Sequence, residues 1–358
     1  MTGKSLLIMQ DRALAEDVDR LAAAAGCALH SVADIGAARP LWSESPLILL
    51  DPAALAHCGA AGLARRPGVL VLCRGEPPPA IWREAMQVGA ERVLALPDAE
   101  SSVVGVLADA AEGATGDGRV IAVVGGRGGA GASVFVGAVG LLAVRRGERV
   151  LLVDCDPLGG GLDLLLGVEQ ADGLRWPDLS VTGGRVPAEA LHGALPAVAL
   201  PAAAGSGPLT VLSCGRGGES PAADAVASVL DAGRRAGDTV VCDVPRHMPA
   251  EASVALDRAD LVVLVVPAEV RGCAAAVPVV KRLLERGCAV HAVVRGPAPG
   301  GLVPADVARA LSVPLLTAMR PASRLAAALE AGRLPLRSTH GPLARAAAVV
   351  LDAVGVCG

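Results

Sequence analysis

The residues best suited to chemistry in this sequence form a glycine-rich loop between an apolar run and an apolar helical pattern. Glycines let backbone N–H groups curl around a phosphate, and the helix that follows adds a favourable dipole. The loop fits the phosphate-binding pattern G-x-x-x-x-G-K-[ST], except that alanine replaces the lysine. Its residues are Gly126, Arg127, Gly128, Gly129, Ala130, Gly131, Ala132 and Ser133. We therefore expect this loop to bind the phosphates of a nucleotide.

The same loop also fits a dinucleotide-binding pattern, so the loop alone does not decide between two functions. Gly126, Gly128 and Gly131 match G-x-G-x-x-G, and Asp154 follows at a strand end, where a ribose-binding acid would lie. The next residues favour the phosphate loop, because a ribose site needs neither Asp156 nor the proline and three glycines that follow it. A Rossmann-type oxidoreductase is the weaker alternative.

Three segments, in this order and spacing, resemble the MinD/ParA family of ATPases. The loop from Gly126 to Ser133 is similar to the deviant Walker A motif of that family, and Asp154–Pro157 is similar to its D-x-D-P motif. A later apolar run, Thr239–Cys242, ends at Asp243 and is similar to the Walker B segment. The resemblance implies a P-loop nucleotide-binding domain whose cofactors are ATP and Mg²⁺.

The resemblance also implies a role for each acidic or hydroxyl residue. Ser133 would bind Mg²⁺, Asp154 and Asp243 would serve the metal and its water shell, and Asp156 would position the attacking water. Arg127 stands where the family has a signature lysine that reaches across a dimer to the partner's phosphates. Asp156 and Arg127 are therefore the candidate catalytic residues.

The missing lysine predicts weak ATP binding and weak or absent hydrolysis. Ala132 occupies the lysine position, and the nearest lysine in sequence, Lys4, lies in another domain. Losing one charge-assisted hydrogen bond lowers affinity by about 10- to 150-fold. Charge stabilisation in phosphoryl transfer is worth about 10³ or more in rate. The alternative is an active dimeric ATPase in which Arg127 acts in trans.

The segment that would read the base also departs from the family. Members of the family often read adenine with an asparagine after a late strand, where this chain has Val294 and Arg295. Base selectivity is therefore left open, and we expect Arg295 to be a solvated loop residue.

Two α/β domains are expected to position these residues. Apolar runs of strand length alternate with helical patterns, which predicts mainly parallel sheets covered on both faces. A glycine-rich polar run separates a receiver-like (flavodoxin-like) domain, residues 1–112, from a MinD/ParA-like domain, residues 120–358, with 113–119 as linker. We expect residues 173–208 to form loops around a short helix. The expected strands are Leu6–Met9, Leu47–Leu50, Val69–Leu72, Arg92–Leu96, Val120–Val124, Arg149–Val153, Leu209–Leu212, Thr239–Cys242, Leu261–Val266, Ala289–Val294 and Val313–Leu316.

The first domain carries receiver chemistry in incomplete form. Asp51 ends a strand where a response-regulator receiver has its phosphoacceptor. A receiver has an acidic pair for Mg²⁺ where this chain has Gln10 and Asp11, a hydroxyl where it has Cys73, and a lysine where it has Leu96. We therefore interpret Asp51 as a vestigial phosphoacceptor in a docking module.

The pairing of the two domains narrows the resemblance to the CpaE/TadZ group of pilus-assembly positioning proteins. It is closer still to the CpaE-like septum-site determining proteins (Ssd) of high-GC bacteria, and Gly173–Pro177 and Val293–Pro297 are similar to stretches of that group. The resemblance implies a cytoplasmic regulator of septum-site determination or of pilus or secretion-system localisation. Its partners would be proteins at the septum or pole, and nucleotide would favour a homodimer.

Composition disfavours some other functions. The net charge is −4, no basic run exceeds two or three residues, and aromatics make up 1% of the chain, so we do not expect nucleic-acid binding. A ParA-like chromosome-partitioning protein that binds nonspecific DNA is the alternative. The apolar runs are far shorter than the ~20 residues of a membrane span, which leaves only peripheral membrane association open. Leu343–Val354 lacks a basic face and is expected to pack on the core.

Overall fold

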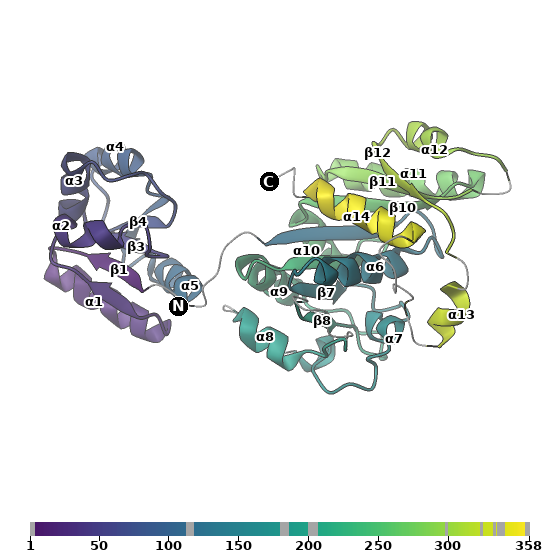
Figure 1. The fold of residues 1–358 in the computed structure, drawn as a ribbon, viewed down its shortest axis with the longest axis horizontal. Helices are drawn as coiled ribbons and strands as arrows, with labels where there is room; N and C mark the ends of the chain where they lie inside the picture. The colour runs from purple at the N-terminus through teal and green to yellow at the C-terminus, as the bar shows by residue number, and fades with distance from the viewer. Residues whose placement is uncertain are drawn as a thin grey trace. The chain divides into compact units, whose positions relative to one another are not determined.

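The chain forms two compact units, Met1–Ala114 and Thr115–Gly358, in a computed structural model (Figure 1). The structure describes residues 4–111, 118–179, 186–199, 207–297, 300–322, 325–331, 334 and 341–354. Each unit has its own parallel sheet and its own cores, and each is described by itself. Among the described residues, no helix has both the length and the apolar character needed to cross a membrane.

Unit 1 is a five-stranded parallel sheet in the order β2-β1-β3-β4-β5. Apolar side chains of α1 and α5 pack on one face, and those of α2, α3 and α4 pack on the other. Its elements are β1 (Ser5–Ile8), α1 (Arg12–Ala24), β2 (Leu29–Ser31), α2 (Ile35–Ala38), η1 (Arg39–Leu41), β3 (Ile48–Leu50), α3 (Pro52–Ala61), β4 (Val69–Arg74), α4 (Pro79–Val88), β5 (Arg92–Leu96) and α5 (Glu100–Ala111). The receiver-like layout is confirmed.

Unit 2 is a seven-stranded parallel sheet in the order β12-β11-β10-β6-β9-β7-β8. Its elements up to β9 are β6 (Arg119–Gly125), α6 (Ala132–Arg145), β7 (Val150–Asp154), α7 (Leu162–Leu166), η2 (Trp176–Asp178), α8 (Ala188–Ala194), β8 (Leu209–Leu212), α9 (Ala223–Arg235) and β9 (Thr239–Val244). The later elements are α10 (Ala250–Asp257), β10 (Leu261–Pro267), α11 (Val270–Glu285), β11 (Val290–Arg295), α12 (Pro304–Leu311), β12 (Leu315–Met319), α13 (Leu325–Glu330) and α14 (Pro342–Val354).

The central strands of unit 2 are apolar throughout because helices cover both faces of its sheet. Every residue of β10 is buried, as expected for an interior strand of a parallel sheet. The helices α6 and α14 share one core, and α9 to α12 share the other. Figure 1 shows α14, in yellow, beside α6, so the prediction that the C-terminal stretch packs on the core is confirmed.

Most predicted strands are present, with two differences at sheet edges. The structure adds β2, whose short sequence Leu-His-Ser is half-exposed and gives no apolar run. The last strand lies at Leu315–Met319, later than predicted. A short helix, α8, lies within the predicted loop region, while residues 180–185 and 200–206 lie outside the described part of the chain. Six of the nine cysteines are buried.

The strand order places the chemistry at one edge of the sheet of unit 2. Strand β6 lies between β10 and β9, and β9 pairs with β7. Because all these strands are parallel, their carboxyl ends meet at a single edge. That edge carries the glycine-rich loop after β6, the loop after β7 that begins at Asp154, and Asp243 near the end of β9.

Candidate functional site

The glycine-rich loop joins β6 to α6 in a conformation that depends on its glycines. Gly129 and Gly131 have φ angles of 71° and 96°, which residues with side chains rarely adopt. A Cβ atom on Gly126 would lie 2.9 Å from the Cβ of Ala276, so only glycine allows this close approach to α11. The backbone N–H groups of Gly128, Gly129 and Gly131 donate to no other group among the described residues.

These free donors fit the phosphate chain of a nucleotide. A Cβ atom on Gly128 or Gly129 would meet no other atom within 4 Å, so the loop faces open space. The loop also ends at the N-terminus of α6, whose dipole favours an anion. Unpaired N–H groups beside open space at a helix N-terminus are what an oxyanion needs.

Two buried carboxylates lie next to this loop. Asp154 and Asp243 are paired in the β7–β9 register and are 2% and 6% exposed. The Ser133 side chain, in the first turn of α6, lies beside Asp243 and favours the ionised form of its carboxylate. Burial, together with the nearby Asp154, raises the pKa of Asp243 to about 7, and burial also raises the pKa of Asp154. A hydroxyl and two carboxylates beside a phosphate site are the oxygen ligands that Mg²⁺ accepts.

A cavity of about 680 Å³ joins these groups to the loop after β7. Ser133, Asp154 and Asp243 line it together with Gly159–Gly161, and Leu329 of α13 lines its far side. Among the described residues, no group of three or more His, Cys, Asp or Glu side chains could hold a metal ion by itself. A metal in this cavity would therefore depend on the Ser133 hydroxyl and on oxygens of a phosphate or of water.

Asp154 is the centre of the loop that follows β7. Its Oδ1 accepts a hydrogen bond from the N–H of Asp156 at 3.0 Å, and its Oδ2 accepts from the N–H of Leu162 and from the Ser213 hydroxyl, both at 3.1 Å. The indole Nε1 of the buried Trp176 donates to the Asp154 carbonyl at 2.7 Å. These bonds fix the path of the loop around a single carboxylate.

Asp156 is placed differently from the other candidate residues. Its Oδ1 accepts a hydrogen bond from the N–H of Leu158 at 3.2 Å, and a Cβ atom on Gly159 would lie 3.3 Å from its carboxylate. Asp156 is not among the described residues that line the cavity of about 680 Å³. Its role in positioning water stays a prediction.

An ion-pair cluster lies behind the same loop. Asp163 accepts hydrogen bonds from Arg216 at 2.9 Å and from Arg175 at 3.4 Å. The Ser213 hydroxyl lies 3.1 Å from a carboxylate oxygen of Asp163 and 3.1 Å from one of Asp154. Burial opposes ionisation, yet hydrogen bonds from Arg216 hold the pKa of Asp163 below its ordinary value. Ser213 thus links Asp154, a candidate metal ligand, to this ion-pair cluster.

Arg127 is held by an ion pair instead of facing open space. Its Nη2 lies 2.9 Å from Oε2 of Glu269, and its Nη1 donates to the Gly128 carbonyl at 3.4 Å. Its Nε is buried and has no hydrogen-bond partner among the described residues. A phosphate contact by Arg127, in cis or in trans, would have to break the pair with Glu269.

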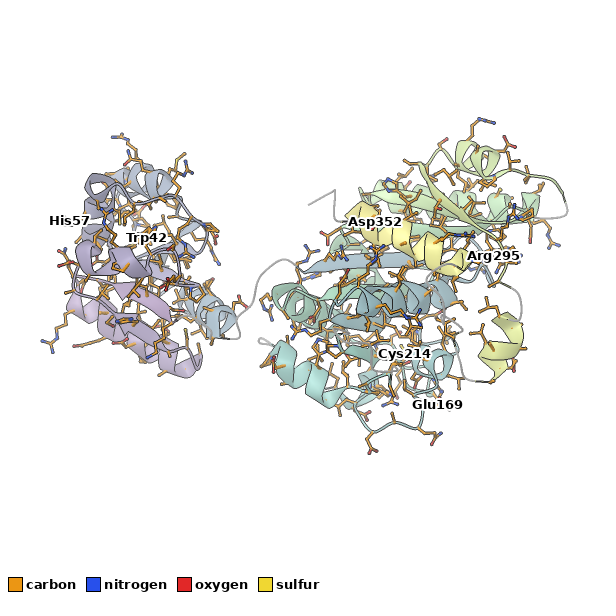
Figure 2. The ribbon with its side chains drawn as sticks, in the orientation of Figure 1. Trp42, His57, Glu169, Cys214, Arg295 and Asp352 are labelled. Atoms are coloured by element: carbon orange, nitrogen blue, oxygen red, sulfur yellow. The ribbon has the colours of Figure 1, made fainter. Side chains whose placement is uncertain are left out.

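A second cavity, of about 580 Å³, adjoins the other side of the loop. Gly129 and Gly131 line it, as do Glu269, Arg295 and Arg320. Arg295 is the last residue of β11 and is partly buried, so the prediction of a solvated loop residue is wrong (Figure 2). Its Nη1 lies 3.3 Å from the position that a Cβ atom would take on Gly131.

In unit 1, the carboxylate of Asp51 is buried and engaged on both oxygens. Asp51 is 1% exposed. Its Oδ2 accepts from the backbone N–H groups of Gln10, at 2.6 Å, and Asp11, at 2.8 Å, and its Oδ1 accepts from Ala54, at 2.7 Å. Asp51 therefore caps the first turn of α3 and ties it to the end of β1, which is a structural role.

The chain is similar to a known protein over nearly its whole length and to a family model over its N-terminal part. The family model described as "Rv3660c-like, CheY-like N-terminal domain" matches residues 8–118. The Mycobacterium tuberculosis protein Rv3660c is 46% identical over 348 residues, which cover 96% of this chain and 96% of that protein. The chain belongs to the Rv3660c-like family.

Solved structures match the second unit of this Rv3660c-like chain. MinD of Aquifex aeolicus is 22% identical with a TM-score of 0.52, over 66% of this chain and 97% of that one. MinD of Pyrococcus horikoshii, complexed with Mg-ADP, is 18% identical with a TM-score of 0.51, over 67% and 99%. A ParA family ATPase of Chlorobium tepidum is 15% identical with a TM-score of 0.55, over 66% and 98%. At these identities the likeness shows the fold, which is of the MinD/ParA P-loop type.

Sequence reasoning on this Rv3660c-like chain missed residues that only the fold brings to the site. Ser213 and Arg216 follow β8, which pairs with β7, so they meet the loop after β7 from a segment about 50 residues away. Glu269 reaches Arg127 from the segment after β10. In the sequence, polar residues follow each of these strands. This pattern identifies residues of the site only when the order of the strands in the sheet is known.

Proposed function

We propose that this chain is a regulatory or positioning protein whose second unit binds ATP and Mg²⁺ weakly and hydrolyses ATP slowly or not at all. One observation carries the proposal: the loop offers free N–H donors and a Ser133–Asp243 pair, yet Ala132 supplies no charge. The Pyrococcus horikoshii protein of the same fold is complexed with Mg-ADP, which supports this choice of ligand.

Each part of the site has a defined task in this proposal. The loop from Gly126 to Ser133 binds the phosphates through its backbone. Ser133, Asp154 and Asp243 would hold the metal, and Asp243 would give up its proton to bind the cation. Mg²⁺, when bound, neutralises phosphate charge. Asp156 positions the attacking water if hydrolysis occurs.

Slow hydrolysis follows from the charges that the site lacks. Transfer of a phosphoryl group is accelerated mainly by positioned positive charge, worth about 10³ or more in rate for a single arginine finger. Ala132 contributes none, and the guanidinium of Arg127 is paired with Glu269. The nucleotide therefore acts as a ligand that changes the state of the protein more than as a fuel.

The partners of this switch are proposed to be proteins. We assign the chain to the cytoplasm, with recruitment to the septum or a pole by division machinery or by pilus or secretion-system machinery. Nucleotide would favour a homodimer with altered partner affinity. The Aquifex aeolicus MinD structure that contains MinC supports a protein partner for this fold. Unit 1, whose Asp51 serves as a helix cap, would be a docking module and not a phosphorylation switch.

Titration with ATP and Mg²⁺, following affinity and dimerisation together, tests the proposal. We expect weak binding by the wild type, tighter binding by Ala132→Lys, and no binding by Gly131→Val, because a side chain at Gly131 is strained. Phosphate release by the wild type at about 1 s⁻¹ or faster, a typical enzyme rate, with Gly131→Val inactive, would show a working ATPase and overturn the proposal.

A further inference from the structure

The phosphate loop has a charge deficit that another residue can fill. Loops of this pattern place a lysine against the phosphates, and Ala132 leaves that place uncharged. Arg127 cannot fill it in this structure because Glu269 holds its guanidinium. Arg295, delivered from a different strand, lies against the loop at Gly131.

The backbone of Arg295 is held by neighbouring strands on both sides, so the position from which its side chain extends is well defined. In the sheet, Arg295 is paired with Pro267 of β10 and with Met319 of β12. Its carbonyl accepts a hydrogen bond from the N–H of Ala268 at 2.9 Å. A guanidinium that starts from an interior strand of a sheet is better positioned than one that starts from a loop.

The charge of Arg295 is available to a ligand. Arg295 has no ion pair with any other residue in the described part of the chain, whereas Arg127 has one. Glu269 is the one carboxylate among the described residues that line the same cavity, and it is already paired. Arg320 also lines the cavity but is exposed, while Arg295 is partly buried. A partly desolvated, uncompensated guanidinium beside free N–H donors attracts an oxyanion.

We propose that Arg295 replaces the missing lysine as the cation that binds the phosphates of the nucleotide. The ligand class is a nucleoside di- or triphosphate with its phosphates on Gly128–Gly131 and the guanidinium of Arg295 donating to phosphate oxygens. This inference rests on the proposed function, because it assigns a residue to the same nucleotide site. It gives the last residue of β11 a phosphate-binding role, where members of the resembled family often have an asparagine that reads the base.

Competition binding with a fluorescent ATP analogue and Mg²⁺ tests the proposal, with Arg295→Gln as the variant and Arg320→Gln as the matched control. Both arginines line one cavity, but only Arg295 lies against the loop. We expect Arg295→Gln to weaken ATP binding by about 10-fold or more, the loss expected for one charge-assisted hydrogen bond. Arg320→Gln should change it by less than about 3-fold, since an exposed charge contributes little.

Two further arms identify what Arg295 binds. Inorganic pyrophosphate, which has no base, should lose affinity for Arg295→Gln by a similar factor; an unchanged pyrophosphate affinity would show that Arg295 serves base or ribose and would overturn the proposal. In the Ala132→Lys background, the same Arg295→Gln change should have a much smaller effect, because lysine then supplies the charge. If Arg295→Gln weakened binding equally in the wild type and in Ala132→Lys, the proposal that Arg295 replaces the lysine would be overturned.

The outcomes also separate this inference from the proposed function. If the wild type binds ATP and Arg295→Gln binds equally well, only the role of Arg295 fails. If the wild type shows no binding but Ala132→Lys does, both fail, since Arg295 then does not replace the lysine. Thermal unfolding without nucleotide checks that each variant is folded. If Arg295→Gln does not fold, Arg295→Met, which keeps an apolar stem without charge, takes its place and should show the same loss of ATP affinity.

Discussion

At the scale of single residues, the two buried acids of the candidate site have no ion pair with any residue in the described part of the chain. Asp154 and Asp243 lie opposite each other in the β7–β9 register, and both side chains are almost completely buried. Burying a carboxylate without a cation favours its protonated form, which is why the pKa of Asp243 is raised to about 7. Metal binding must displace that proton, so affinity for Mg²⁺ should increase as the pH rises through this value.

Asp243→Asn should change how the metal-free protein responds to pH. Below about pH 4, the ordinary pKa of aspartate, Asp243 is protonated in the folded and unfolded chain alike. Between that pH and about 7, only the folded state keeps the proton, so its stabilising effect is lost as the pH rises. From pH 5 to pH 8 the wild type should therefore lose about 2–3 kcal/mol of stability relative to Asp243→Asn, at 1.36 kcal/mol per pH unit.

Urea unfolding at pH 5 and pH 8 in the presence of a metal chelator measures this difference. Asp172→Asn is the control, because Asp172 is an exposed aspartate outside the candidate site. Equal pH dependence of the wild type and Asp243→Asn would contradict the buried, proton-binding state of Asp243. Adding Mg²⁺ at pH 8 should stabilise the wild type and not the variant.

At the scale of elements, the sequence predicts what is local and misses what depends on pairing. Interior strands such as β10 were predictable because parallel strands covered on both faces are continuously apolar. The edge strand β2 was not, since one of its three residues is partly buried and the other two are exposed. The phosphate loop was predictable from its glycines, whereas the place of Arg295 follows from the pairing of β11 with β10, which no local pattern encodes.

Asp51, which follows β3, offers a test of the capping of α3. Asp51→Asn replaces one accepting oxygen with an amide that must face a backbone N–H, and both oxygens are engaged in the wild type. Leaving a buried donor unpaired costs about 1–3 kcal/mol, so the variant should be destabilised by that amount in urea unfolding. Asp11→Asn, at the exposed cap of α1, should cost less. A neutral Asp51→Asn would mean that the carboxylate is not structural.

At the scale of the whole molecule, the question is whether two copies of the chain complete one active site. The active-ATPase alternative requires Arg127 to leave Glu269 and reach the phosphates of a second chain. We expect ATP turnover per chain to stay low and independent of protein concentration. A turnover that rises with concentration and disappears in Arg127→Ala would instead identify a dimeric ATPase. Glu269→Gln, which frees Arg127, provides the matched variant, and it should leave turnover low if no trans contact forms.

The last prediction concerns nucleic acid as a partner of the full chain. A protein that binds nonspecific DNA neutralises phosphates with arginine and lysine, and its affinity falls steeply with salt. This chain has a net charge of −4 and only two lysines, and many of its arginines are already committed to carboxylates, as in the pairs Arg286–Asp257, Arg258–Asp231 and Arg149–Asp238. We therefore expect no binding to duplex DNA at physiological salt, with or without ATP and Mg²⁺, in fluorescence anisotropy. Binding that appears with ATP and weakens linearly with the logarithm of salt concentration would favour the chromosome-partitioning alternative, because only contacts to phosphates give that dependence.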